Sequence, residues 1–394
     1  MNVLRGCRLV TSLLIALSFA LACASGARAA DPVEIPVIVP MTGGAAFIGK
    51  GYSAALTAIE TYVNKHGGVR GRPVKFVISD DAGNPQNSIQ LFSALVAKKV
   101  PVVLGAALVA ECAAMQPLIK DGPMLYCLTP AISPEPGSYV FSVEPSSPDQ
   151  FVTIVHNLRL QGVSRIAVIT STDASGQDAD RSIAAALTAP SSKGASEVAH
   201  EHFNPTDLSV AAQIERIKAA NPQVLLAWTT GTPFGTVLRA ANDAQLNIPI
   251  YTNNGNMTYA QMAAYKDFLP KELRFPAVAN VVPDGITDKG VKAAVDLYVQ
   301  SLKDVGATPE FIPSVAYDPA MLVIAALRAL GPDASAKQVR DYIGSIKDYA
   351  GTNGRYNFQA VPQRGLSINA VFVSHWDPVK NTWTAISKPG GDLR

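Results

Sequence analysis

A run of uncharged polar residues follows a short apolar segment in the second half of the chain. The apolar residues 248–251 lead into Thr252, Asn253, Asn254, Gly255 and Asn256. This pattern is typical of a strand that ends in a loop, and α/β proteins place their ligands at the carboxyl ends of strands. Amide and hydroxyl groups can hydrogen-bond a ligand there without a formal charge. Asparagines beside a glycine also form turns and cap helices, so both interpretations stay open.

Small and hydroxyl-bearing residues follow the other expected strands as well. Among them are Ala107, Ala131, Ser133 and Thr230. Trp228 and Tyr251 stand at strand ends, where each ring could line a cleft or belong to the core. The glycine-rich loop 40–51 leaves free amides before a helix, which favours an anion site as much as an ordinary βα loop. It has neither P-loop nor dinucleotide-binding spacing.

Signals for catalysis or metal binding are weak. Asp80 and Asp81 could act as paired carboxylates, but the following Gly-Asn-Pro favours a turn and a helix cap. His200 and His202 share one face of an expected strand, with no third ligand evident, so a solvated edge strand is favoured. The sequence contains no GxSxG, HExxH or SxxK motif. We therefore expect no enzyme, no metal and no cofactor.

Short apolar strands alternate with amphipathic helices along most of the chain. Such alternation predicts parallel sheets covered by helices on both faces, the α/β class. The expected strands are 34–39, 74–79, 100–104, 123–128, 139–143, 165–170, 196–202, 224–228 and 248–252, followed by a closing hairpin of 370–375 and 382–386. The expected helices are 51–66, 86–98, 112–120, one around 181–187, 209–220, 233–244, 290–306, 317–330 and 336–346.

The first thirty residues have the composition of a secretory leader. Arg5 and Arg8 precede an apolar stretch that is short for a membrane span, and residues 27–29 form an A-x-A cleavage site. Lipid anchoring at Cys23 is a weaker alternative, because the lipobox is incomplete. The leader holds three basic residues, so residues 31–394 carry 30 basic and 31 acidic side chains. No nucleic-acid partner is indicated, and no later segment is expected to span a membrane.

Two cysteines remain after the leader, in a compartment that permits disulfides. Cys112 is expected at the start of a helix and Cys127 in the strand that follows. These two elements can lie side by side, so we predict a disulfide, with two free buried thiols as the alternative. The chain has no CxxC motif, which argues against redox catalysis.

A chain of this length favours two lobes. The strand–helix alternation is interrupted by a Pro- and Ser-rich stretch at 133–148 and by a Pro-containing section at 273–283. We expect the chain to cross between lobes there, which places a cleft between two α/β units that close about a hinge. Lobe 1 is predicted to comprise residues 31–145 and 283–350, and lobe 2 residues 146–282 and 351–394, after a leader of residues 1–29.

Several motifs occur together at the spacing of a known family. Pro40-Met41-Thr42-Gly43 opens the series, the segment 64–74 follows, and Asp80-Asp81 with Asn84-Pro85 closes it. This combination resembles the type I periplasmic solute-binding proteins of the leucine/isoleucine/valine-binding branch, over essentially all of residues 31–394. The resemblance implies two Rossmann-like lobes, a three-crossing hinge and no catalysis. It also implies a periplasmic monomer that delivers a small molecule to an ABC transporter permease.

The family's ligand contacts are matched only in part. The loop that supplies a serine to the ligand carboxylate offers Ala107 here, while Ala131 and Ser133 match the second carboxylate-binding loop. Family tyrosines are replaced at Ser175 and absent near Thr230.

The departure with the largest consequence is at Asn254, where the resemblance implies an acidic residue that pairs with the ligand's ammonium group. A buried ammonium without an anionic partner costs several kcal/mol. We therefore expect a small organic acid, such as an aromatic carboxylate, packed against Phe47, Trp228 and Tyr251. The alternatives are an amino acid or amide whose charge is met by Glu111 or Asp173, a chemoreceptor partner in place of an importer, and a secreted enzyme.

Overall fold

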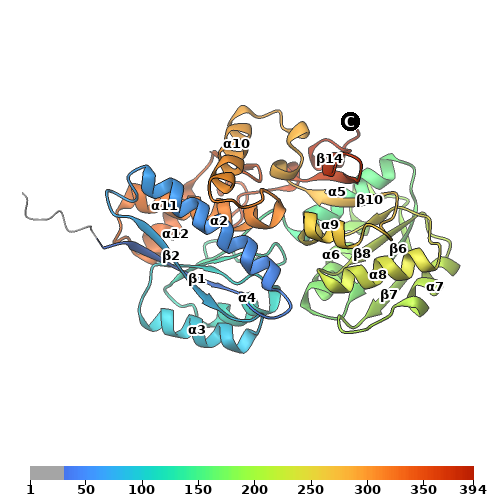
Figure 1. Ribbon diagram of the computed structural model, residues 1–394, viewed down its shortest axis with the longest axis horizontal. Coiled ribbons are helices and arrows are strands. Elements are labelled where there is room, and N and C mark those ends of the chain that lie inside the picture. The colour runs from blue at the N-terminus through green and yellow to red at the C-terminus, as the bar shows by residue number, and fades with distance from the viewer. Residues whose placement is uncertain (1–30) are drawn as a thin grey trace, which may run out of the picture.

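The computed structural model describes residues 31–394, which form two lobes side by side (Figure 1). The leader predicted for residues 1–29 and the lipid anchor considered at Cys23 lie outside the described residues. Each lobe has its own sheet, and a small hairpin of β11 (Tyr349–Ala350) and β12 (Arg355–Tyr356) stands apart from both.

Lobe 1 contains a five-stranded parallel sheet in the order β2-β1-β3-β4-β5. Its strands β3 and β4 are buried along their whole length because helices cover both faces of the sheet. Its strands are β1 (Val33–Val39), β2 (Val74–Asp80), β3 (Val102–Gly105), β4 (Met124–Cys127) and β5 (Val140–Ser142), and its helices are α2 (Ala46–Lys65), α3 (Pro85–Ala97), α4 (Val109–Met115), α10 (Lys289–Asp304), α11 (Phe311–Leu330) and α12 (Ala336–Ser345).

Helix α11 differs from the sequence expectation at its start. It begins at Phe311, six residues earlier than expected. Pro313 does not prevent this start, because it lies in the first turn, where a missing amide proton is tolerated. Its length and apolar composition would suffice for a membrane span, which corrects the expectation that no segment after the leader reaches that limit. In the structure α11 is largely buried against α2, as the core helix of lobe 1.

Lobe 2 contains a seven-stranded sheet in the order β14-β13-β10-β9-β8-β6-β7. The five strands from β10 to β7 are parallel, and the antiparallel pair β13 and β14 extends the sheet. Its strands are β6 (Arg165–Ser171), β7 (Ser196–Phe203), β8 (Val224–Trp228), β9 (Ile250–Tyr251), β10 (Leu273–Ala277), β13 (Phe372–Asp377) and β14 (Thr382–Ala385), and its helices are α5 (Ser147–Leu160), α6 (Ala174–Thr188), α7 (Ala211–Ala219), α8 (Thr232–Asp243) and α9 (Tyr259–Ala264).

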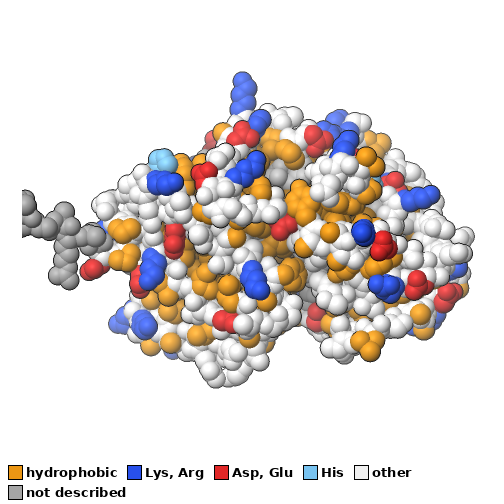
Figure 2. Space-filling model, in the orientation of Figure 1, with side chains coloured by type: hydrophobic (Ala, Val, Ile, Leu, Met, Phe, Trp, Pro, Cys, Tyr) orange, Lys and Arg blue, Asp and Glu red, His pale blue; other side chains and the backbone are white. Residues whose placement is uncertain are grey.

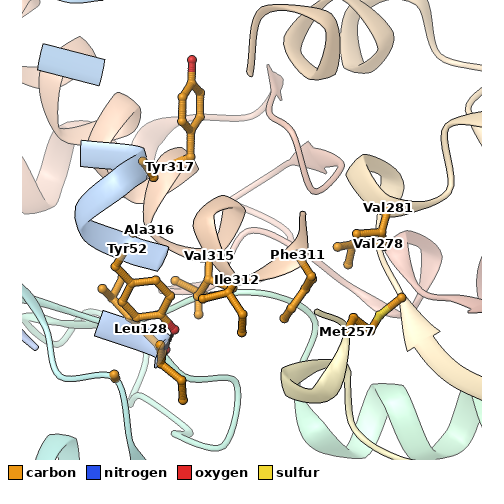
Figure 3. Packing of buried hydrophobic residues seen from close by; sticks show 14 of the residues in the cluster. Tyr52, Leu128, Met257, Val278, Val281, Phe311, Ile312, Val315, Ala316 and Tyr317 are labelled. Atoms are coloured by element: carbon orange, nitrogen blue, oxygen red, sulfur yellow. Dashed lines mark hydrogen bonds between the residues drawn. The ribbon is translucent and has the colours of Figure 1, made fainter. Parts of the chain in front are cut away.

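The chain passes between the lobes three times. The first crossing joins β5 to α5 through residues 143–146, the second joins β10 to α10 through 278–288, and the third leads from α12 to β13 through 346–371. Figure 3 shows the start of α11 between the two lobes, with Tyr52 and Leu128 on one side and Met257 and Val278 on the other. This apolar junction forms the floor between the two sheets.

A buried arginine connects the first and third crossings. The guanidinium of Arg364 donates to the carbonyl oxygens of Val143 (2.9 Å) and Glu144 (3.1 Å), and also to that of Ile132. Burial lowers the pKa of Arg364 to about 10. The group remains charged at neutral pH, and its bonds to three carbonyl oxygens compensate for its removal from water.

Candidate binding site

A cavity of about 640 Å³ lies between the lobes, where the carboxyl ends of both parallel sheets meet. Figure 2 shows hydrophobic side chains gathered near the junction of the two lobes. Lobe 1 contributes the start of α2 and the loops after β2, β3 and β4. Lobe 2 contributes the starts of α5, α6 and α8 and the loop after β9, and the start of α11 completes the wall.

The side chain of Asn254 meets a carboxyl group in the first crossing. Its Nδ2 donates to Oε2 of Glu144 at 2.6 Å, and both residues are buried and line the cavity. Burial raises the pKa of Glu144 to about 7, although the bond from Asn254 and the charge of Arg364 oppose the shift. The loop after β9 is therefore not a neutral site by itself, because it is paired with an ionisable acid.

The two neighbouring asparagines have structural roles. Asn256 accepts from the amide of Gly231 at 2.9 Å and donates to the carbonyl oxygen of Thr229 at 2.8 Å. Asn253 donates to the same carbonyl oxygen at 2.9 Å and accepts from Thr230. Both side chains tie the loop after β9 to the loop after β8. Of the three asparagines, only Asn254 contacts the first crossing, through its hydrogen bond to Glu144.

Three further carboxyl groups line the cavity. Glu111, on α4, is buried, and its Oε2 has no hydrogen-bond partner among residues 31–394. Burial raises the pKa of Glu111. Burial also raises the pKa of Asp178. Asp173 caps α6 by accepting from the amide of Gly176 at 3.0 Å and from the hydroxyl of Ser175 at 2.8 Å. Within residues 31–394, no Lys, Arg or His side chain lines this cavity.

Aromatic side chains form part of the cavity wall. Trp228 is 6% exposed, and its ring centre lies 4.1 Å from that of Phe151. Phe47 approaches from lobe 1 toward Gly231, where an added Cβ would lie 3.4 Å from the ring. Tyr52 donates its hydroxyl to the carbonyl oxygen of Leu128 at 3.1 Å. The cavity thus combines apolar surfaces with acids, which suits a small solute with a polar end and an apolar body.

The sequence-based family model described as "Periplasmic binding protein" matches residues 32–381. The chain belongs to the periplasmic binding protein family. This periplasmic binding protein is 25% identical over 250 residues to Leu/Ile/Val-binding protein homolog 3 of Brucella melitensis, an alignment that covers 62% of this chain and 67% of the relative. The resemblance to the leucine/isoleucine/valine-binding branch is confirmed. Its family and relatives are binding proteins and not enzymes.

Solved structures confirm the two-lobed type I fold of this binding protein. An extracellular ligand-binding receptor from Rhodopseudomonas palustris HaA2 matches with a TM-score of 0.80 at 21% identity, over 90% of this chain and 99% of that one. The substrate-binding protein LivJ of Streptococcus pneumoniae, solved with isoleucine, matches with a TM-score of 0.75 at 18% identity, over 90% and 98% of the two chains. At these identities the likeness concerns the fold alone.

The structure brings most of the predicted contact residues of the binding protein to one cavity. Those that line it are Phe47, Ala107, Ala131, Ser175, Trp228, Thr230 and Asn254. Their roles toward a ligand remain predictions. Sequence reasoning missed Glu144 and Tyr52. The only signal for Glu144 was a lone acid at the end of an apolar run.

Two predicted contacts lie elsewhere. Tyr251 is fully buried, and its hydroxyl accepts from Arg274 at 2.8 Å in the core of lobe 2. The residue belongs to a buried hydrophobic cluster of lobe 2 and does not line the cavity. Ser133 lines a smaller pocket of about 160 Å³ beside Asp178 and Arg181, and not the main cavity. Neither residue is therefore positioned for the contact that the sequence suggested.

The carboxylates at the end of β2 are structural in this binding protein, as the sequence favoured. Asp80 accepts from the amides of Met41 (2.8 Å) and Thr42 (3.2 Å), and its hydrogen bonds lower its pKa to about 2. Asp81 accepts from Gly83, and Asn84 caps α3. These amides of the glycine-rich loop already donate to Asp80. The alternative that they bind an anionic group of a ligand therefore loses support.

The two cysteines of the described chain are neighbours. Cys112 lies on α4 and Cys127 at the end of β4, with their Cα atoms 6.0 Å apart and both sulfur atoms in bonding position. A Cα separation of this size is within the range of protein disulfides. The bond would hold α4, which carries Glu111, to the sheet of lobe 1.

Proposed function

We propose that this periplasmic binding protein is the solute-binding component of an ABC importer and holds a small amine-bearing solute, such as an amino acid or its amide. The observation that carries this proposal is the charge of the cavity wall. Four carboxyl side chains line it, from Glu111, Glu144, Asp173 and Asp178, and the wall formed by residues 31–394 has no basic side chain.

A cationic ligand would compensate for these acids, of which Glu111 and Glu144 are buried. Removing an ammonium group from water is costly unless an anion receives it, and the same holds for a carboxylate. Glu111 presents an oxygen that lacks a hydrogen-bond partner in the part of the chain that the structure describes, so an ammonium group placed there would give both groups a partner. The neutrality of Asn254, on which the organic-acid prediction rested, is offset by its neighbour Glu144.

The aromatic carboxylate predicted from the sequence fits this wall less well. Its ring could still pack against Phe47 and Trp228, but its negative charge would face acids with no cation among the described lining residues. An amine-bearing ligand can use the same aromatic surfaces for its apolar body. We therefore place amino acids and amides first and organic acids second.

The importer role is supported by the relatives. The Brucella protein is named as a Leu/Ile/Val-binding protein homolog, and the leader expected in residues 1–29 fits a periplasmic location. A permease is then the expected partner, and a chemoreceptor is the alternative. Mass spectrometry of the N-terminus of protein from the periplasmic fraction tests the location. A chain beginning near residue 30 supports it, and a lipidated Cys23 indicates an anchored protein.

Ligand class is tested by a thermal-shift panel of amino acids, amides, amines, and aromatic and aliphatic acids, followed by calorimetry on the hits. Ligands of the folded state raise the melting temperature. We expect amine-bearing hits whose affinity falls about tenfold or more in Glu111→Gln, since bonds to charged groups contribute about 1.5–3 kcal/mol. Glu215→Gln, on the exposed face of α7, is the matched control and leaves affinity unchanged. Tight binding of benzoate-type acids without any amine hit would overturn the proposal.

A further inference from the structure

A group of side chains that could bind a metal ion lies in lobe 2, outside the cleft. His200 and His202 project from β7, the edge strand of the sheet, toward Asp180 on α6. The Nε2 atom of His200 lies 2.9 Å from Oδ1 of Asp180, and that of His202 lies 3.1 Å from Oδ2. The third ligand, which was not evident from the sequence, is therefore Asp180 on α6, twenty residues before His200.

The three ligand atoms are close to the spacing of a tetrahedral metal site. They all lie within 4.8 Å of one another. Bonds of 2.0–2.1 Å at tetrahedral angles separate neighbouring ligand atoms by roughly 3.3 Å. The two imidazole–carboxylate separations differ from this value by only a few tenths of an ångström. Small side-chain movements would admit an ion without a change in the backbone.

Surrounding groups orient the ligands as in known metal sites. Nδ1 of His200 lies 3.1 Å from Oε1 of Glu197, and Thr170 donates to Oδ1 of Asp180 at 2.8 Å. With its Nδ1–H given to Glu197, His200 can offer the lone pair of Nε2 to a metal ion once the proton that Nε2 donates to Asp180 is released. A carboxylate behind a ligating histidine is the usual outer partner in zinc sites.

The cluster is accessible to an ion from solution. The side chains of Asp180, His200 and His202 are 29%, 23% and 50% exposed. The histidine rings stack with their centres 4.6 Å apart, so both edges face the same carboxylate. The basic side chain of Arg216 is bound to Glu201, the residue between the two histidines.

From this geometry we propose that Asp180, His200 and His202 form a binding site for a divalent transition-metal ion of the zinc class, with water in the fourth position. Two imidazoles and one carboxylate suit Zn²⁺ and its neighbours better than Mg²⁺ or Ca²⁺, which take oxygen ligands. The site is independent of the proposed cleft ligand. It would fasten α6, whose first turn lines the cleft, to the edge of the sheet.

The test is a titration of the purified protein, free of any polyhistidine tag, with Zn²⁺ in competition with a chromophoric chelator. We expect one equivalent to bind and to raise the melting temperature. His202→Gln and Asp180→Asn should each weaken binding by about 100-fold or more, and Glu197→Gln by about tenfold. His202 is half-exposed, so its replacement leaves folding intact, as circular dichroism would verify.

The matched control is His156→Gln, because His156 pairs with a single carboxylate, Asp392, at 2.9 Å and has no second imidazole. This variant should bind Zn²⁺ like the unaltered protein. Titration with Co²⁺ gives a second readout, since a low-coordinate N/O site produces intense visible absorption that His202→Gln should abolish. The absence of stoichiometric Zn²⁺ binding, or equal binding by His202→Gln and Asp180→Asn, would overturn the proposal.

Discussion

The side-chain amide of Asn254 and the carboxyl group of Glu144 are joined by a hydrogen bond of 2.6 Å between the loop after β9 and the first crossing. Asn254 belongs to lobe 2, and Glu144 follows the last strand of the lobe 1 sheet. The bond therefore links the cavity wall of lobe 2 directly to a segment that connects the two lobes. It also places a group with a pKa of about 7 at the bottom of the cleft.

Stability should fall with rising pH because of Glu144. Its folded pKa of about 7 is above the ordinary value of 4.5, so the folded state retains a proton that the unfolded state releases. The contribution of Glu144 to the free energy of unfolding is complete below the unfolded-state pKa and is lost as pH rises through the folded-state pKa. The free energy of unfolding should therefore fall by about 2 kcal/mol between about pH 5 and pH 8. Denaturant unfolding at both pH values measures it. Glu144→Gln should remove this part of the slope, and an unchanged slope would contradict the assignment.

Asn254→Asp introduces the acid that the resemblance implied at this position. Two carboxyl groups at this distance cannot both ionise without a large cost, so one of them should keep a proton. We expect a loss of about 1–3 kcal/mol in unfolding free energy at about pH 8 and a smaller loss at about pH 5. Chemical denaturation of the variant at both pH values measures the difference. Asn242→Asp, on an exposed turn of α8, is the control and should change stability little.

Arg364→Met should destabilise the hinge. The substitution leaves the carbonyl oxygens of Ile132, Val143 and Glu144 without this donor, which costs about 3 kcal/mol or more. Because the charge of Arg364 opposes the shift at Glu144, the pKa of Glu144 should rise further. Carboxyl titration by infrared or NMR spectroscopy gives this second readout.

The control for Arg364→Met is Arg165→Met. Arg165 also donates to two backbone carbonyl oxygens, those of Ala220 and Asn221, but it is exposed. Its loss should cost less than about 1 kcal/mol. Equal losses in the two variants would show that burial of Arg364 adds nothing to its role.

The Cys112–Cys127 pair should be found oxidised in protein from the periplasm. Peptide mapping without reductant should yield one cross-linked species that contains both residues. A loop closed over a sequence separation of 15 contributes about 3 kcal/mol by the chain-entropy model, so Cys112→Ala with Cys127→Ala should lose about that much. Alkylation of both thiols in the untreated protein would instead establish the free-thiol alternative.

The order of strands and helices could be predicted from the sequence because buried parallel strands appear in it as uninterrupted apolar runs. Residues 224–228 were expected as a strand and are strand β8 over the same range. The ends of helices that lie near proline residues were harder to predict. The start of α11 was placed late, since Pro313 reads as a breaker unless its position in the first turn is known.

The candidate site could be predicted only in part. An apolar strand pattern does not show which face of the sheet, once covered by helices, borders the cleft. Trp228 and Tyr251 both end apolar strands, yet only Trp228 lines the cavity. Glu144 was missed for a related reason. Its meeting with Asn254, which is 110 residues away in the chain, depends on how the two lobes are joined. Likewise, Asp180 joins His200 and His202 only when α6 packs beside β7.

The bonds from Arg364 make the first and third crossings a single mechanical piece. Two segments that are hydrogen-bonded to each other cannot move independently, so we expect any closing motion of the lobes to rotate about an axis near this guanidinium. Groups beside that axis, such as Glu144, would then move little, whereas residues that face each other across the lobes, such as Phe47 and Gly231, would move farther. We therefore expect ligand contacts at the base of the cleft to change little on closure, and contacts at the rim to change most.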